Sequence, residues 1–179
     1  MRLFHYSEDP AISKFIPRPV QGASNRPAGR EWLNSPLVWA IEEAHQRMYL
    51  FPRECPRILL WATSKTTAAD AERWLEGNPK QPLAIIERDW LERLQLGKII
   101  RYEMPAGMFH DTKDAGMWVS RVAVNPLDKV TLTDLPAKLK ESGTELRVVD
   151  SLLPWKDVWS STVHASGIRL RNAKGWPTE

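Results

Sequence analysis

Short apolar runs of strand length recur along this chain, and helical patterns separate only some of them. Several of the runs are bounded by proline or glycine, as is typical of strands. They cover residues 2–8, 36–41, 56–62, 83–86, 98–104, 117–124, 129–132, 145–149 and 168–171. Helical spacing is found at residues 42–50, 66–76, 89–96, 134–142 and 154–161. Because strands do not alternate regularly with helices, the sequence predicts an α+β fold with a mixed, mostly antiparallel sheet and flanking helices.

A chain of 179 residues with 42% hydrophobic residues can bury a core of its own. No shift in composition marks a boundary, so we expect a single domain over residues 1–179. The longest irregular segment, residues 9–35, is rich in proline and arginine, which is often the composition of a binding loop or lid. The stretch after residue 172 is expected to be a loose tail.

The cysteine content and the absence of long apolar runs indicate the cellular compartment. Cys55 is the single cysteine, so no internal disulfide can form, as in proteins of reducing compartments. The sequence has no signal peptide and no apolar run long enough to cross a bilayer. We therefore expect a cytoplasmic protein that does not use a membrane.

Charge and motifs exclude several function classes. The net charge is +3 with a pI near 9.1, and the basic residues are spread along the chain without a stripe. A nucleic acid is therefore a less favoured partner than a small ligand. Neither phosphate-binding glycine motif, GxxxxGK[ST] or GxGxxG, occurs. No metal is predicted, because metal-ligand spacing is absent from the candidates His5, His45, His110, His164 and Cys55.

The first predicted strand carries the most site-like pattern. Alternation places Leu3, His5 and Ser7 on one face, so that an imidazole and a hydroxyl point the same way. These two groups are candidates for binding or catalysis. The alternative is that His5 is a structural residue held by hydrogen bonds.

Two further groups of residues are candidates for function, and each also has an ordinary structural explanation. The segment at residues 24–30 brings Arg26 and Arg30 together, and guanidinium groups suit phosphate. Alternatively, this loop only covers a sheet edge. Near the end of the chain, Ser160 and Ser161 lie close to His164, which leaves open a hydrolase with a scattered serine–histidine site.

Particular motifs resemble those of a family of bacterial proteins of unknown function over residues 2–176. The motifs are His5-Tyr6-Ser7, Val38-Trp39-Ala40-Ile41, Tyr49-Leu50-Phe51-Pro52-Arg53, Cys55-Pro56-Arg57, Trp118-Val119-Ser120-Arg121 and Ile168-Arg169-Leu170-Arg171-Asn172-Ala173. That resemblance implies no activity.

The same elements are distantly similar to the ADP-ribosyltransferase and RNA 2′-phosphotransferase superfamily, which implies a split sheet and an NAD-like ligand. In that superfamily a first strand supplies a histidine, here His5, and a second strand and helix supply an aromatic residue, here Trp39 or Tyr49. The third element is similar to residues 117–126. Where a glutamate is expected, this chain has Gly116-Met117, a departure that removes the expected carboxylate.

The leading hypothesis is a protein that binds NAD or a related nucleotide. His5 and Arg121 are the candidate catalytic residues. The candidate cofactor-binding residues are Ser7, Arg30, Trp39 and Tyr49. If the protein is an enzyme, the resemblance implies a transferase acting on NAD or a phosphorylated nucleotide. The alternatives are a non-catalytic domain that binds protein or nucleic acid, and the serine–histidine hydrolase.

Overall fold

The computed structural model describes residues 1–20, 26 and 28–177. Contacts between Cα atoms divide the chain into two compact units, each made of two separate segments. Unit 1 contains residues 1–46 and 99–132, and unit 2 contains residues 47–98 and 133–179. Each unit has its own sheet with helices beside it, and most strand pairs are antiparallel. The predicted α+β class is thereby confirmed.

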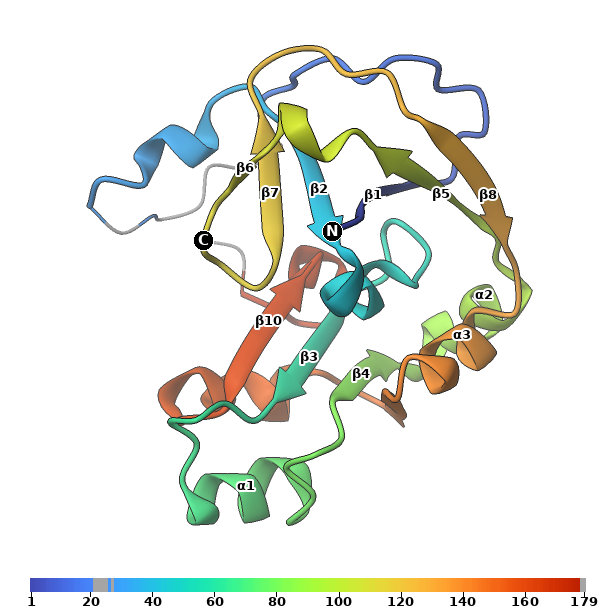
Figure 1. Ribbon diagram of the computed structural model, residues 1–179. Coiled ribbons are helices and arrows are strands. Elements are labelled where there is room, and N and C mark those ends of the chain that lie inside the picture. Colours follow the sequence, from blue (N-terminus) through green and yellow to red (C-terminus); the bar gives the residue numbers. More distant parts are fainter. Residues whose placement is uncertain (21–25, 27, 178–179) are drawn as a thin grey trace. The chain divides into compact units, whose positions relative to one another are not determined.

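Unit 1 is built on a six-stranded sheet in which β1 lies between β2 and β5 (Figure 1). In order across the sheet, the strands are β6 (His110–Asp111), β7 (Met117–Ser120), β2 (Val38–Glu42), β1 (Leu3–Ser7), β5 (Ile99–Met104) and β8 (Asp128–Leu132). Every neighbouring pair is antiparallel. The 3₁₀ helices of this part of the chain are η1 (Glu31–Asn34), η4 (Ala106–Met108) and the first half of η2 (Glu43–Tyr49).

One face of this sheet is covered by the segment after β1. Phe15 forms an antiparallel bridge with Val124, and both pack in a cluster with Leu3 and Tyr102. The Tyr102 hydroxyl donates to the Asp9 carbonyl oxygen at 2.6 Å and accepts from the Ile12 amide at 3.3 Å. The start of the long segment at residues 9–35 is therefore held by backbone hydrogen bonds to Val124 and by hydrogen bonds to a buried phenol.

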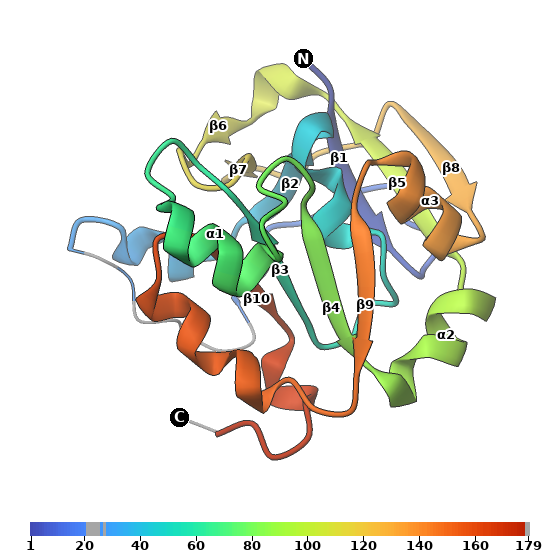
Figure 2. The same cartoon turned by 90° about the horizontal axis from the view of Figure 1, so that it is seen from below.

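Unit 2 is built on a four-stranded sheet that mixes parallel and antiparallel pairs (Figure 2). Its strands, in order, are β10 (His164–Ile168), β3 (Arg57–Trp61), β4 (Leu83–Glu87) and β9 (Glu145–Val149). The pair β4–β9 is parallel. The helices are α1 (Ala68–Leu75), α2 (Leu91–Leu96), α3 (Leu135–Glu141) and the 3₁₀ helices η3 (Arg88–Trp90), η5 (Leu153–Ser160) and η6 (Leu170–Asn172).

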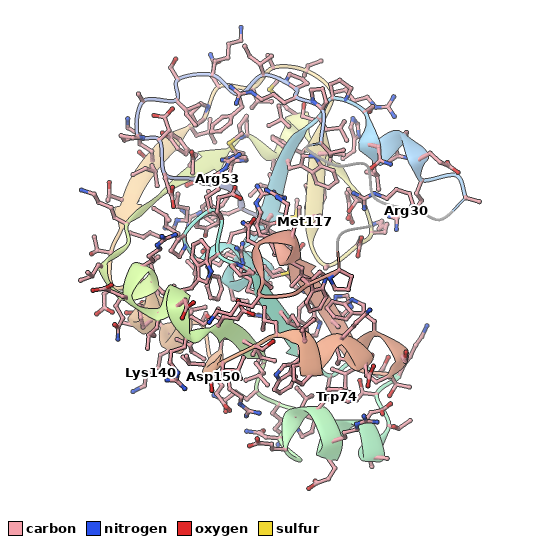
Figure 3. All side chains as sticks on the ribbon, turned by 180° about the vertical axis from the view of Figure 1, so that it is seen from behind. Arg30, Arg53, Trp74, Met117, Lys140 and Asp150 are labelled. Atoms are coloured by element: carbon pink, nitrogen blue, oxygen red, sulfur yellow. The ribbon has the colours of Figure 1, made fainter. Side chains whose placement is uncertain are left out.

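Helix α1 covers one face of this sheet because its apolar residues fall on one side. Trp74 and Leu75 pack with Ile58, Leu60 and the start of η5. Thr67 caps the helix by accepting from the Asp70 amide at 3.2 Å. Figure 3 labels Trp74 on the side of α1 that faces η5.

A buried carboxylate fixes the C-terminal segment of unit 2. Glu87 is 1% exposed and accepts from the Leu152 amide at 3.2 Å and the Lys174 amide at 3.1 Å. Ala173 is 7% exposed and belongs to the apolar core. The chain after residue 172 therefore makes specific contacts with β4.

Several predicted elements are wrong in detail. The strand predicted at residues 168–171 is a turn of 3₁₀ helix, and the strand itself is β10, at His164–Ile168. The helices predicted at 42–50 and 154–161 are the 3₁₀ helices η2 and η5. The strand predicted at 117–124 ends at Ser120.

Candidate functional site

His5 and Ser7 share one face of β1, as predicted, and both have structural contacts. Nδ1 of His5 donates to the Trp39 carbonyl oxygen at 2.7 Å, and its ring lies 4.6 Å from the Phe15 ring between centroids. The β1–β2 ladder runs over Leu3↔Glu42 and Phe4↔Ile41, so this imidazole continues the link between the two strands. Ser7 is 5% exposed and accepts from the Asp9 amide at 3.1 Å.

The indole of Trp39 lies on the other face of the sheet. Alternation along β2 separates Trp39 from Ala40, which belongs to the cluster that contains Leu3. Trp39 packs against a second cluster formed by Leu33, Leu37 and Val119. The structure therefore joins His5 to the backbone of Trp39 and does not place the two rings on one face.

Three of the predicted residues surround η1. Arg121 follows β7, and its guanidinium carbon lies 5.0 Å from the ring centroid of Trp32, a residue that is 37% exposed. Arg30 precedes η1 and donates to the Thr112 carbonyl oxygen, and Figure 3 labels Arg30 beside the η1 ribbon. Trp39 packs against Leu33 of η1.

A second arginine–tryptophan pair joins the same region. The guanidinium carbon of Arg26 lies 5.9 Å from the Trp39 ring centroid, and Arg26 Nε donates to Asn34 Oδ1 at 3.4 Å. Of the predicted arginine loop at residues 24–30, residues 24, 25 and 27 lie outside the described part of the chain. We call Arg26, Arg30, Trp32, Trp39 and Arg121 the η1 cluster.

Tyr49 belongs to unit 2, whereas the other predicted binding residues belong to unit 1. Its ring centroid lies 5.7 Å from the guanidinium carbon of Arg57, which is 2% exposed. Arg57 donates to the carbonyl oxygens of Met48 at 2.8 Å and Cys55 at 2.9 Å. Burial lowers the pKa of this guanidinium to about 10. Tyr49 therefore contributes to the surroundings of a buried cation.

Burial also makes Cys55 an unreactive thiol. Cys55 is 0% exposed, and burial raises the pKa of its thiol to about 12. A thiol reacts as the thiolate, and both access and ionisation are suppressed here. We expect a thiol reagent to label Cys55 slowly in the native protein and fully in denaturant. Fast labelling of native protein, followed by absorbance, would contradict this prediction.

Sequence reasoning missed a carboxylate–imidazole pair at the end of β2. His45 Nδ1 donates to Glu42 Oε1 at 2.6 Å, and the side chains are 25% and 27% exposed. Gly116 lies against the pair with φ +71°, and a Cβ there would come within 2.5 Å of His45 Nδ1 and 2.8 Å of Glu42 Oε1. The Glu42 amide donates to the Gly116 carbonyl oxygen at 2.9 Å. The Glu42 carboxylate therefore lies directly beside position 116.

The signal for this pair in the sequence is the spacing of Glu42 and His45, three residues apart. The neighbouring Glu43 contacts Arg2 at 3.2 Å instead, so the two adjacent glutamates have separate partners. Nothing local in the sequence connects either residue with Gly116.

The basic residues near the C-terminus are paired within unit 2. Arg169 and Arg171 contact the Glu54 carboxylate at 3.3 and 3.0 Å, and Lys174 contacts Asp89 at 2.8 Å. Burial raises the pKa of Glu54, but hydrogen bonding from Asn172 and the arginine charges outweigh it and lower that pKa. These contacts do not favour a nucleic-acid surface at the C-terminal segment.

The predicted serine–histidine group also has structural contacts. The Ser161 hydroxyl donates to the Val158 carbonyl oxygen at 2.7 Å and accepts from the Val163 amide at 3.2 Å. The His164 ring stacks on Trp61 with 4.0 Å between centroids. This geometry gives no support to Ser161 as a nucleophile.

Neither a metal-binding cluster nor a membrane-spanning helix is found among the described residues. No group of three or more histidine, cysteine, aspartate or glutamate residues within them is arranged to hold a metal ion. Among the same residues, no helix combines the length and the apolar character that a membrane span requires.

The fold and these contacts define an α+β protein with two sheets and an arginine–tryptophan cluster beside η1. The chain belongs to a family of unknown function, DUF6886, whose family model matches residues 4–173. No curated protein and no solved structure matched the chain. The predicted membership of a family of unknown function is confirmed.

Proposed function

We propose that unit 1 binds a small nucleotide, NAD or a related molecule, at the η1 cluster. The observation that carries this proposal is the pairing of guanidinium groups with indole rings around one short helix, with Arg121 exposed and Arg26 half-buried. A nucleotide needs a flat surface for its base and cations for its phosphates. Indoles provide the first and arginines the second.

The cluster includes three residues that sequence reasoning selected independently for this role, namely Arg30, Trp39 and Arg121. Arg121 is exposed, and it lies on Trp32, whose ring is partly open to solvent. Stacking of a base on an aromatic side chain contributes about 1–3 kcal/mol in single-strand binders.

We expect NAD, ADP-ribose or a mononucleotide to raise the melting temperature of the wild-type protein. At a hundredfold excess over Kd, the ligand adds about 2.7 kcal/mol to the free energy of unfolding. Arg121→Ala and Trp32→Ala remove cluster side chains and are expected to abolish most of this shift. The measurement is a thermal-shift titration of each variant with each ligand.

Arg93→Ala is the matched control. Arg93 also lies over a tryptophan, with 4.8 Å from its guanidinium carbon to the Trp90 ring centroid, but it belongs to unit 2. It should retain the full shift. If the ligands do not raise the melting temperature of the wild type, or raise it equally in all variants, the η1 cluster is not the binding site.

His5→Ala separates the two faces of the sheet. If the shift is lost in His5→Ala and kept in Arg121→Ala, the ligand binds on the face that carries His5 and Ser7. If the reverse holds, His5 has the structural role that its bond to the Trp39 carbonyl indicates.

A further inference from the structure

Strand β8 forms an edge of the six-stranded sheet of unit 1 (Figure 1). On its inner side it pairs with β5 without interruption from Glu103↔Asp128 to Ile99↔Leu132. Among the residues that the structure describes, no strand pairs with its outer side. The backbone N–H and C=O groups that point outward from β8 can therefore receive a further strand.

Both sheets end in strands of this kind, and β8 is the one that is long and exposed. The other end of its own sheet is β6, which has 2 residues. The sheet of unit 2 ends in β9 and β10, in which all residues but one are half-buried. In β8, residues 128–131 are all exposed. An exposed edge of this length is the kind of strand to which another strand adds.

β8 lacks the features that commonly keep edge strands apart. Proteins protect such edges with lysine side chains, with proline or with a β-bulge. β8 contains no proline, and its unbroken register with β5 contains no bulge. Its lysine, Lys129, donates through Nζ to the Pro10 carbonyl oxygen at 2.5 Å, so that its charge is held against the segment that follows β1. Val130, at the centre of the strand, is 43% exposed.

The sequence of β8 favours a second copy of the same strand as its partner. Two identical edges join as antiparallel strands about a two-fold axis perpendicular to the sheet, and this axis passes through one residue of the strand. With the axis at Val130, all 5 residues of β8 are paired. Val130 then lies opposite Val130 of the second copy, and Lys129 lies opposite Thr131. Asp128 lies opposite Leu132, so no like charges face each other.

The other positions of the axis are less favourable. An axis at Lys129 would place two ammonium groups opposite each other, and an axis at Asp128 would do the same with two carboxylates, which destabilises a strand pair. An axis at Thr131 or Leu132 would leave part of β8 unpaired. The register centred on Val130 is therefore the one that combines full pairing with acceptable charges.

We propose that two copies of this chain associate through β8, with Val130 at the two-fold axis, and so join their six-stranded sheets. Each Val130 covers the other and is removed from water. Because the strand is short, the interface is small, and we expect a dissociation constant of about 10 µM to 1 mM. The proposal is independent of the η1 cluster, since β1 and β5 lie between β8 and β2, which carries Trp39.

Analytical ultracentrifugation at increasing protein concentration tests this association. The mass of the wild type should rise from 20.5 kDa towards twice that value as the concentration passes Kd. Val130→Lys and Val130→Glu each place like charges opposite each other at the axis, so each variant alone should associate at least about tenfold more weakly. Val122→Lys is the matched control, because Val122 is 54% exposed and lies outside β8. It should keep the wild-type Kd.

A mixture of Val130→Lys with Val130→Glu tests the register. It brings opposite charges together at the axis, so the mixed dimer should form at least as tightly as the wild-type dimer. Mixing would not reverse a loss of folding. The proposal is overturned if the wild type stays at 20.5 kDa up to about 1 mM, which would leave β8 to an extended segment of another protein. It is also overturned if the mixture stays monomeric, if either Val130 variant alone associates as tightly as the wild type, or if Val122→Lys weakens association equally.

Discussion

Replacing Arg57 with leucine is expected to lower the free energy of unfolding by about 3–5 kcal/mol. The guanidinium is 2% exposed and donates to the carbonyl oxygens of Met48 and Cys55. Leucine cannot donate, so both carbonyls would lose this partner in a buried setting, at about 1–3 kcal/mol each. The measurement is a urea denaturation curve for each variant.

Arg57→Lys and Arg88→Ala complete this experiment. Lysine keeps the charge but lacks the planar fork that reaches both carbonyls, so we expect a loss smaller than that of leucine and still above about 1 kcal/mol. Arg88 forms a salt bridge to Asp150 between side chains that are 63% and 86% exposed. Its replacement should change stability by at most about 1 kcal/mol. Equal effects at Arg57 and Arg88 would show that the buried contacts do not matter.

Replacing Gly116 with alanine is expected to destabilise the protein and to displace the Glu42–His45 pair. Alanine at φ +71° is strained by about 1–3 kcal/mol, and its methyl group would also meet His45 Nδ1 at 2.5 Å. The measurements are the free energy of unfolding and the NMR signal of the His45 Nδ1 proton, which should shift when the 2.6 Å bond is lost.

Gly143→Ala is the matched control for this prediction. Gly143 has a similar φ of +74°, but a Cβ there would meet nothing within 4 Å. It therefore reports backbone strain alone, and the excess loss in Gly116→Ala reports the collision with the pair. If the two variants lose the same stability and the His45 signal is unchanged, Gly116 is needed only for its backbone conformation.

Strands with strong alternation or apolar runs could be predicted from the sequence. Strands that form only because they pair with another strand could not. Leu3–Ser7 and Arg57–Trp61 are rich in residues that suit a pleated surface. The strand His164–Ile168 contains His, Ala, Ser and Gly, and it is a strand because it pairs with β3 along its length. Because these residues have a weak intrinsic preference for strands, the strand was predicted at residues 168–171, where polar and apolar residues alternate more regularly.

The candidate sites likewise combine features that the sequence shows locally with features that depend on contacts between distant segments. Arg30, Trp39 and Arg121 were selected for their chemistry, and the fold places all three around η1. His5 and Trp39 were assigned to one site with no prediction of the face of Trp39, and alternation separates their rings. Glu42 and His45 were visible as a pair at helical spacing, but their contact with Gly116 joins distant segments of the sequence.

The parallel pairing of β4 with β9 has a consequence for how this protein can be made and divided. Between these two strands the chain leaves unit 2, supplies residues 99–132 to unit 1, and returns. Strand β1 is synthesised early, yet its five-pair ladder with β5 requires residues 100–104. The first sheet therefore cannot be completed on the ribosome until β8, which ends at Leu132, has emerged. No single cut separates the two units, and expressing either alone requires joining two distant segments.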